Sequence, residues 1–477
     1  MRRNLFTIAL TFFLLLVSTL GLLLWVRTTR TDQNTVAVST EMVEILQLFG
    51  QKKWQGYDIS QPARLLQQAE DRFEMGDGAT TSQLLSDARK ALDSASLLYR
   101  DHAKSLAGTD PNGNFLFLPW TTYTPFEREI EWAAQRYDVF VFGITQTELV
   151  QKVKTYNPDA EIFLYVDLRV TAETPASYPS LPEWNTILVQ HPDWLLTGSD
   201  GRPVTTDGDL TYYWPNPGVP EFQTFASIRI LQSLEQSQVN WDGVVLDSAR
   251  TLRDLSGDGV ADIATYPSDE AYKTSQELFL TKLHQTLHDS AFKLVTILPP
   301  YASQNEDWKG LSERSDGILL SFVGREDFNS ESGFISMDQW RNQLRILEQV
   351  RSDYLTLVMT PVPFWSDKPM SLYGFATMLL SRDTTRDLLY YYGLEETASI
   401  PAYWYHEYEI DLGDATSPIA TENDILVRLF QRGVVAVNPT DQERVVSFSG
   451  TYQAVTGETT SVVTLSPHTA VILKTPN

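Results

Sequence analysis

Two apolar runs, Ile162-Phe163-Leu164-Tyr165-Val166-Asp167 and Trp241-Asp242-Gly243-Val244-Val245-Leu246-Asp247, each end in an aspartate. Short runs rich in β-branched and aromatic residues are typical of buried strands. Six further runs of this kind occur at 115–118, 139–142, 294–298, 318–320, 355–359 and 388–391. Amphipathic segments such as 126–137 and 275–287 separate most of them. The alternation predicts an α/β fold, a (β/α)8 TIM-type barrel over residues 111–420.

An open, doubly wound parallel sheet is the alternative arrangement for such an alternation. That fold commonly carries a glycine-rich phosphate-binding loop after its first strand. The sequence has no G-x-G-x-x-G after the first run and no Walker-type loop anywhere. The barrel is therefore favoured, and so is a reaction without a nucleotide cofactor.

The segments before and after the predicted barrel have different sequence patterns. Residues 31–110 carry apolar residues at helical spacing, interrupted by Gly76-Asp77-Gly78, and predict a helical stalk or collar. Residues 421–477 carry short apolar runs separated by Asn-Pro, Ser-Gly and Thr-Gly turns. They predict a small antiparallel C-terminal domain, a β-sandwich.

Residues 1–30 predict a transmembrane anchor. The uncharged run from Leu5 to Val26 is long enough to cross a hydrocarbon core of about 30 Å as a helix. Arginines flank both ends, so the positive-inside rule gives no clear orientation. We expect an uncleaved signal anchor, a single-pass membrane protein with the bulk of the chain extracytoplasmic.

The amino-acid composition limits which binding partners and cofactors the protein can have. With 61 acidic and 37 basic residues the formal net charge is −24, which disfavours nucleic acid because phosphate backbones bind basic surfaces. The absence of cysteine excludes disulfides, thiol catalysis and cysteine-ligated metals. We expect no cofactor beyond a structural calcium ion.

The chemistry is expected at the carboxyl ends of the strands, where barrel enzymes carry their active sites. Asp167 and Asp247 each end a predicted strand, and Glu326 lies shortly after another. Two carboxylates at a barrel mouth suit glycosidic cleavage, in which one protonates the leaving oxygen and the other attacks the anomeric carbon or activates water. The sequence leaves a retaining or an inverting outcome open.

Aromatic residues in the predicted strand-end loops favour a carbohydrate cleft, since flat rings pack on sugar rings. The candidate substrate-binding residues are Trp120, Tyr213, Trp214, Asn216, Trp365 and Trp404. Large aromatics also serve as core packing, and that interpretation stays open for each of them.

Metal-binding patterns are weak. Asp254, Asp258 and Asp262 resemble the first positions of a calcium loop, but Thr265 stands where a bidentate glutamate belongs. His284 and His288 share a helical face without the glutamate of a zinc-protease motif, and we expect an exposed helix surface there.

The stretch from Trp214-Pro215-Asn216-Pro217 to Pro220-Glu221, followed by the run ending at Asp247, resembles a paired motif of bacterial glycoside-hydrolase-like (β/α)8 barrels of unknown specificity. The resemblance covers about 114–414 and implies that Asp247 is the catalytic carboxylate. It also implies a carbohydrate-associated domain after the barrel. Ser321 stands where related barrels often carry the acid, which makes Glu326 a displaced candidate and leaves a degenerate enzyme open.

The sequence therefore predicts a membrane-anchored glycoside hydrolase acting on a poly- or oligosaccharide through Asp247, with Asp167 or Glu326 as partner. Two alternatives remain. One is a non-catalytic glycan-binding protein on a degenerate barrel, and the other is a scaffold of polysaccharide synthesis or export that meets envelope-protein partners through the stalk.

Overall fold

The computed structural model describes most of the 477-residue chain. The described residues are 38, 41–42, 44–45, 48–49, 60–74, 77–95, 117–120, 127–171, 181, 184–207, 211–255, 259–298, 308–321, 323–325, 333–350, 354–361, 368–382, 388–393 and 405–476. The chain divides into two compact units, Met1–Gly108 and Thr109–Asn477, which we treat separately.

The first unit is built around a helical hairpin, α3 (Ser60–Glu74) and α4 (Gly78–Ser94). Asp77 begins α4 as its N-cap, and its side chain accepts a hydrogen bond from the backbone N–H of Thr80 at 3.2 Å. Leu85, Ala88 and Leu92 of α4 are fully buried. The predicted break at Gly76–Gly78 thus separates two packed helices. The apolar run Leu5–Val26 lies outside the described residues, and within them no helix combines the length and apolarity that a membrane span requires.

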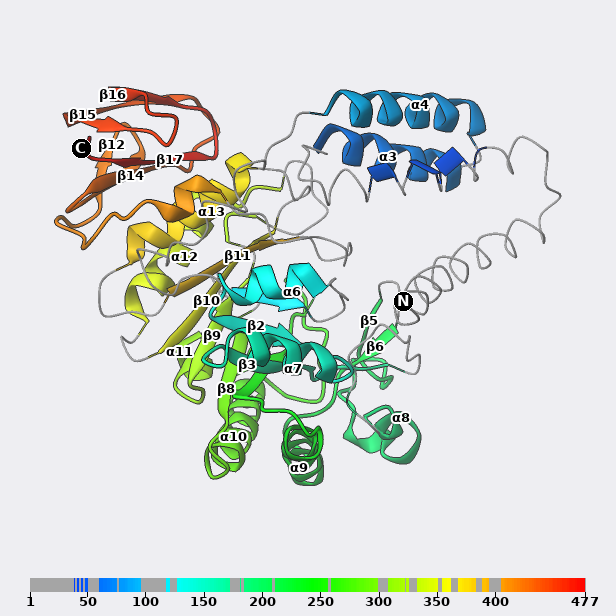
Figure 1. The fold of residues 1–477 in the computed structure, drawn as a ribbon. Coiled ribbons are helices and arrows are strands. Elements are labelled where there is room, and N and C mark those ends of the chain that lie inside the picture. The colour runs from blue at the N-terminus through cyan, green and yellow to red at the C-terminus, as the bar shows by residue number, and fades with distance from the viewer. Residues whose placement is uncertain are drawn as a thin grey trace. The chain divides into compact units, whose positions relative to one another are not determined.

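The second unit contains eight parallel strands in the order β1-β2-β3-β7-β8-β9-β10-β11, which we call the barrel sheet (Figure 1). The first and last strands, β1 and β11, are in contact. All eight apolar runs of the sequence are strands. Their bounds are β1 Phe117–Trp120, β2 Val139–Phe142, β3 Glu161–Asp167, β7 Gly243–Asp247, β8 Lys293–Leu298, β9 Gly317–Leu320, β10 Leu355–Pro361 and β11 Leu388–Gly393.

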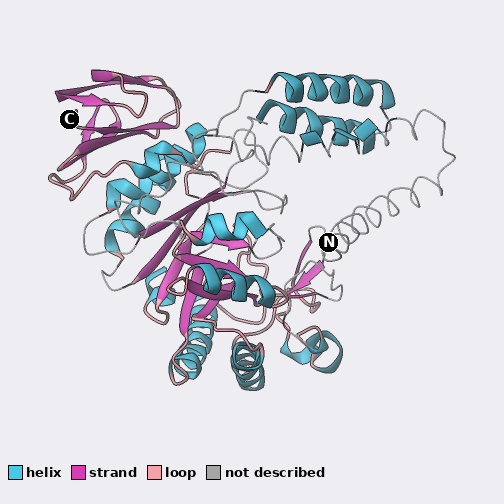
Figure 2. Cartoon of the chain, in the orientation of Figure 1, coloured by secondary structure: helices cyan, strands magenta, loops and turns pink. Residues whose placement is uncertain are grey.

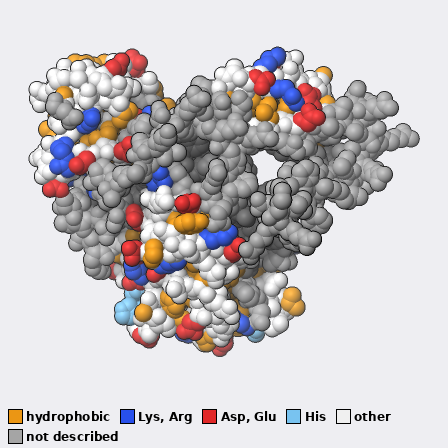
Figure 3. Space-filling model, in the orientation of Figure 1, with side chains coloured by type: hydrophobic (Ala, Val, Ile, Leu, Met, Phe, Trp, Pro, Cys, Tyr) orange, Lys and Arg blue, Asp and Glu red, His pale blue; other side chains and the backbone are white. Residues whose placement is uncertain are grey.

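Helices connect these strands and lie outside them (Figure 2). Ser336 begins α12 with a capping box completed by Gln339, and Ser268 caps α10. Figure 1 shows α9 and α10 side by side, and the two are in contact. On the face drawn in Figure 3, acidic and basic side chains are interspersed over the described helices. The helix bounds are α6 Glu127–Ala134, α7 Thr147–Tyr156, α9 Pro220–Gln236, α10 Asp269–His288, α11 Trp308–Ser312, α12 Met337–Gln349 and α13 Lys368–Ser381.

Alternate residues of the barrel strands form one apolar cluster inside the sheet. Successive side chains of a strand point to opposite faces, so residues two apart share a face. The cluster contains Val139, Val141, Phe163, Val245, Val295, Leu319 and Leu357, with Tyr165, Ile297, Leu355 and Met359 packed against it. Residues 163 and 165 of β3 and residue 245 of β7 therefore face inward. By the same alternation Asp167 and Asp247 belong to the inward face, at the carboxyl end.

The amino ends of two strands share one device, an Asp-Gly pair. Asp242 accepts a hydrogen bond from the N–H of Ile162 in the neighbouring strand at 2.7 Å and forms an ion pair with Lys154 at 3.0 Å. Asp316 likewise accepts from the N–H of Leu294 at 2.8 Å. The glycine that follows allows close approach, because a Cβ on Gly243 would lie 2.2 Å from the carbonyl oxygen of Lys293.

His284 also lies at the amino ends of the barrel strands. Its Nε2 lies 3.1 Å from Asp316 Oδ1, and the side chain is half-buried. The prediction that His284 and His288 lie on an exposed helix surface is therefore wrong for His284. Helix α10 packs this histidine against Asp316, directly before the amino end of β9.

A small subdomain follows β3, which we call the insert (Leu168–Val219). It contains an antiparallel sheet of order β4-β6-β5, formed by Val170–Thr171, Thr211–Tyr213 and Thr205–Asp207. It also contains α8 (Thr186–Gln190) and the short helix Pro192–Trp194. Its core joins the segment after β7 in one cluster of Leu196, Val204, Trp214, Leu255, Ile263 and Tyr272.

The C-terminal strands form one antiparallel sheet in the order β12-β13-β14-β17-β15-β16, with a 3-10 helix, His406–Glu409, before it. The β15–β16 pair joins the sheet through Gln453 and Lys474. The predicted sandwich is thus one hydrogen-bonded sheet whose strands share an apolar core of Ile425, Ala436, Val446 and Leu465. Its bounds are β12 Ala420–Glu422, β13 Ile425–Phe430, β14 Gly433–Asn438, β15 Arg444–Gln453, β16 Thr459–Leu465 and β17 Thr469–Lys474.

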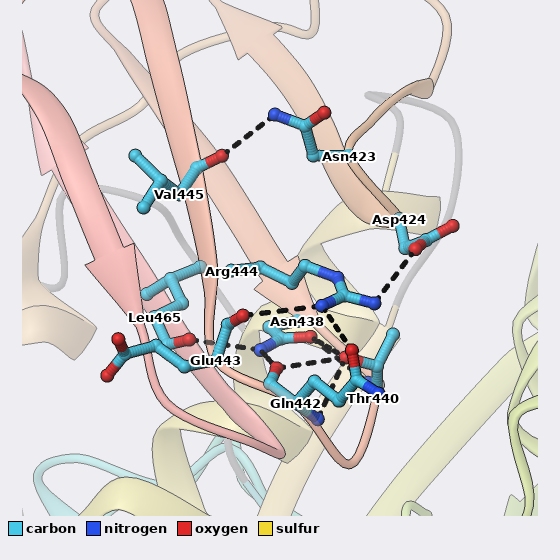
Figure 4. A network of polar contacts seen from close by, with 9 residues as sticks. All are labelled: Asn423, Asp424, Asn438, Thr440, Gln442, Glu443, Arg444, Val445 and Leu465. Atoms are coloured by element: carbon cyan, nitrogen blue, oxygen red, sulfur yellow. Dashed lines mark hydrogen bonds and ion pairs between the residues drawn. The ribbon is translucent and has the colours of Figure 1, made fainter.

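A polar network fixes the turn after β14 (Figure 4). The Asn438 amide donates to the carbonyl oxygens of Gln442, Leu465 and Ser466, while its Oδ1 accepts from the N–H and hydroxyl of Thr440. Arg444 bonds Gln442 and forms an ion pair with Asp424 at 3.2 Å. Asn438 is fully buried, so these contacts satisfy an amide that burial would otherwise penalise.

Helix α13 joins the C-terminal sheet to the barrel sheet. It contacts β10 and β11 on one side and β13, β14 and β17 on the other. Every residue from Met370 to Ser381 is buried. An apolar helix without a polar face is what this position between two sheets requires.

Candidate active site

Asp167 and Asp247 end two adjacent strands of the barrel sheet. Their Cα atoms are register partners in the parallel pair β3–β7. Neighbouring strands lie about 4.8 Å apart, so the two acidic residues stand side by side at the carboxyl end. This is the end at which barrel enzymes carry their active sites.

Asp167 is held in an ion pair with Arg169. The guanidinium Nη2 lies 2.7 Å and Nε 3.0 Å from Asp167 Oδ2, and the Arg169 N–H donates to Oδ1 at 2.9 Å. The Asp167 side chain is only 2% exposed. A carboxyl that accepts this many hydrogen bonds, most of them from a cation, is bound as the anion.

The insert holds Arg169 in turn. The guanidinium carbon lies 4.4 Å from the centre of the Tyr212 ring and 5.9 Å from that of Trp214. Trp184 donates from its indole N–H to the Arg169 carbonyl at 3.2 Å. The arginine that pairs with Asp167 is thus part of the packed insert.

Asp247 has a different environment. The Tyr165 hydroxyl donates to its Oδ2 at 2.6 Å, and the Ser248 N–H donates to its Oδ1 at 2.5 Å. Burial raises the pKa of Asp247, and the neighbouring negative charge of Asp167 raises it further. Arg169, Tyr165 and Ser248 act in the opposite direction without cancelling the rise. A carboxyl with a raised pKa at a strand end is the feature expected of a group that exchanges or shares a proton.

The backbone turns sharply directly after Asp247. Ser248 has φ of 66°, in the left-handed region that non-glycine residues seldom adopt. This conformation accompanies the short hydrogen bond from its N–H to the preceding carboxylate. Strained backbone of this kind clusters at functional sites.

The motif residues between the insert and α9 have structural contacts. Trp214 lies in the core cluster of the insert and is 4% exposed, so this conformation offers no ring face to a sugar. Asn216 Oδ1 accepts from the N–H of Gly218 and from the Tyr266 hydroxyl. Tyr213 of β6 is half-buried. The motif therefore shapes the turn that begins α9, and substrate binding by these residues stays a prediction.

Other predicted site residues lie outside what the structure describes. Glu326, Trp365 and Trp404 are outside the described residues, and for Trp120 only the backbone, in β1, is described. Of the acidic candidates, the structure therefore brings together Asp167 and Asp247. The sequence-based search missed Tyr165 and Arg169, although both lie two residues from Asp167 and so could be suspected from strand alternation.

The calcium prediction is not tested, because Asp258 lies outside the described residues. Asp254 Oδ2 accepts from the N–H of Gly259, and Asp262 Oδ2 accepts from the N–H of Leu255. Within the described residues no three acidic or histidine side chains gather as a metal site.

Comparison with known protein families gives a match to most of the barrel region. A family model described as hypothetical glycosyl hydrolase family 15 matches residues 154–434, more than half of the chain, and this range includes Asp167, Asp247 and Glu326. A search of curated proteins finds no match to this sequence.

Solved structures show a distant likeness. An α-amylase from Lactobacillus plantarum is 11% identical with a TM-score of 0.46, over 77% of this chain and 100% of its own. A noncanonic maltogenic α-amylase from Thermotoga neapolitana is 11% identical with a TM-score of 0.44, over 76% of this chain and 98% of its own. These TM-scores are too low to support an inference about activity.

Proposed function

The chain belongs to hypothetical glycosyl hydrolase family 15, and from this premise we propose that it hydrolyses glycosidic bonds of a poly- or oligosaccharide with Asp247 as a catalytic carboxylate. The observation that carries the proposal is the position of Asp247. It ends the fourth strand of the barrel sheet, beside a second carboxylate in register, and its pKa is raised.

Asp247 and Asp167 have different roles in this proposal. Asp167 is engaged with Arg169 through both guanidinium Nε and Nη2, which suits a permanent anion better than a proton donor. Its charge acts on Asp247 and keeps the proton of Asp247 available over a wider pH range. Asp167 is therefore proposed as an electrostatic partner of Asp247.

The second reacting carboxylate is proposed to be Glu326, which follows β9 in the chain. In the reaction the glycosidic C–O bond breaks, one carboxyl group gives its proton to the leaving oxygen, water adds to the anomeric carbon, and the proton that the water loses passes to a carboxylate of the pair. The water attacks directly when the carboxyls are about 6.5–9.5 Å apart, or after a covalent intermediate when they are about 5 Å apart.

The test is reducing-end release from a panel of bacterial and plant polysaccharides by the full-length protein in detergent. Asp247→Asn should lower the rate of release by about 10³-fold, and Glu326→Gln should also reduce it strongly. Asp167→Asn should leave partial activity with a changed pH profile, because it removes the charge beside Asp247 without removing Asp247. Equal release by wild type and Asp247→Asn would remove Asp247 from the mechanism.

A second candidate function is glycan binding without hydrolysis. Among the described ends of the barrel strands only β3 and β7 carry an acid, and the acid of β3 is paired with Arg169. This candidate would be favoured if the wild-type protein released no reducing ends from any polysaccharide of the panel but bound one of them in isothermal titration calorimetry.

Membrane attachment is part of the proposal. The run Leu5–Val26 is proposed to anchor the protein as a single span with the barrel on the extracytoplasmic side. Protease digestion of intact and of permeabilised cells tests it. Digestion of the barrel in intact cells is expected, and digestion only after permeabilisation would overturn the proposed orientation.

A further inference from the structure

Among the described residues, each carboxylate oxygen of Asp247 receives one hydrogen bond. The Ser248 N–H serves Oδ1, and the Tyr165 hydroxyl serves Oδ2. Tyr165 stands on the neighbouring strand β3, and its ring packs against the inner apolar cluster of the barrel sheet. The hydroxyl that contacts Asp247 therefore belongs to a ring that is packed against the inner apolar cluster.

We propose that Tyr165 is the positioning residue of Asp247: its hydroxyl orients the carboxylate for reaction and stabilises its ionised form. The inference rests on the proposed function and adds a residue to it. Tyr165 acts through Asp247 and so differs from a catalytic residue. It also differs from the motif residues Trp214 and Asn216, whose contacts lie in the insert and its turn.

The charges around Asp247 explain why a neutral donor matters there. Asp167 is the neighbouring anion and opposes ionisation of Asp247, and Arg169 is the neighbouring cation. Arg169 makes its close contacts with Asp167, at 2.7–3.2 Å from Nε and Nη2. Within the described part of the chain, the hydrogen bonds to Asp247 itself come from Tyr165 and Ser248, and both favour the anion.

The hydrogen bond also sets orientation. A carboxylate on the last residue of a strand can rotate, and a donor on each oxygen limits that rotation. The Ser248 donor is a backbone group, and the Tyr165 donor is carried by a partly buried ring that packs against the inner apolar cluster, so both donors are held in place. Loss of one donor should therefore lower the rate and change the titration together.

The first test is Tyr165→Phe in the full-length protein, which removes the hydroxyl and keeps the packed ring. We expect kcat/KM to fall roughly tenfold, the effect of one lost hydrogen bond to a charged group, with KM little changed. The limb of the pH profile that reports Asp247 should move to higher pH, because the anion has lost a donor.

Tyr354→Phe is the matched control. Tyr354 is a buried tyrosine directly before β10, and its hydroxyl contacts Ser312 O at 2.8 Å and Ser315 Oγ at 2.6 Å. This variant loses hydrogen bonds at the amino end of the barrel sheet. It should lower Tm without moving either limb of the pH profile.

A second measurement does not depend on activity. Infrared difference titration follows the carbonyl band of protonated carboxyl groups, and subtraction of Asp247→Asn from wild type assigns the band of Asp247. In Tyr165→Phe this band should disappear at higher pH than in wild type.

The outcomes separate the two proposals. A shifted band with no hydrolysis by wild type would support the Tyr165 contact and remove the glycosidase. An unshifted band in folded Tyr165→Phe would overturn the positioning role, and so would a slower enzyme whose pH profile and band match those of wild type.

Discussion

The two ends of the barrel sheet use the same residue type in opposite ways. At the amino ends, Asp242 and Asp316 accept backbone N–H groups of neighbouring strands, and Lys154 or His284 lies beside them. At the carboxyl ends, Asp167 is paired with an arginine and Asp247 with a neutral tyrosine hydroxyl. The contrast teaches that the partners of an aspartate, more than its position beside a strand, distinguish a structural carboxylate such as Asp242 from Asp247, the carboxylate that we propose to be reactive.

The largest expected effect compares Asp247→Asn with Asp242→Ala. Asp247→Asn should lower kcat/KM by about 10³-fold at unchanged fold, because a carboxyl that transfers a proton or attacks cannot be replaced by an amide. Asp242→Ala should retain kcat/KM and lose about 2 kcal/mol of unfolding free energy, because it leaves the Ile162 N–H without its acceptor and removes the anionic partner of Lys154. Activity assays and urea unfolding check both, and a loss of activity in Asp242→Ala at full stability would break the comparison.

Gly243→Ala should give the largest loss of stability at the amino end, about 3 kcal/mol or more. The added Cβ would lie 2.2 Å from the backbone oxygen of Lys293, which cannot move aside cheaply in a sheet. Gly450→Ala is the control, since the nearest atom to its Cβ would be in the Tyr452 ring at 3.8 Å, an ordinary contact. Thermal unfolding of the two variants should differ clearly, and equal Tm values would contradict the close approach.

A smaller effect is expected in the pH dependence of stability. The pKa of Asp247 is raised in the folded protein above the ordinary value of 3.8, so ionising it opposes folding. The contribution of protonated Asp247 to the free energy of unfolding is fully present below pH 3.8. It is lost as the pH rises through the raised pKa of the folded protein. Asp247→Asn should therefore gain stability over wild type between mildly acid and neutral pH, and this gain should vanish on acidification. A constant difference in unfolding free energy across this range would contradict the shift.

The smallest expected effect concerns two left-handed residues, one at each end. Ser248 has φ of 66° beside Asp247, and Ala291 has φ of 63° before β8. Glycine at either position should raise stability by about 0.5 kcal/mol, the relief of left-handed strain less the entropy that glycine loses on folding. Ala291→Gly should keep kcat/KM, whereas Ser248→Gly should lower it a few-fold, because the N–H that holds Asp247 becomes less rigid. Equal kinetics for the two would remove Ser248 from the site.

Most of the barrel sheet could be predicted from the sequence, because buried parallel strands read as short apolar runs and each run became a strand. Strand ends also gave Asp167 and Asp247. The pairing of Asp167 with Arg169 could not be predicted, since it depends on the insert that packs Tyr212 beside the guanidinium.

The sequence says less about the roles of the aromatic residues. Trp214 lies in a predicted strand-end loop, but it packs in a core shared with Leu255 and Tyr272, which come from beyond β7. Such a contact joins distant segments and leaves no local pattern. The contact of His284 likewise has no local pattern in the sequence, because its partner Asp316 is 32 residues away in the chain.

The burial of α13 has a consequence for how the chain is made. This helix is covered by β10 and β11 and also by β14 and β17, which extends to Lys474. During synthesis β17 must therefore emerge from the ribosome before α13 can be buried on all sides. We expect chains that stall before β17 to expose an apolar helix, and such nascent chains would be natural clients of chaperones.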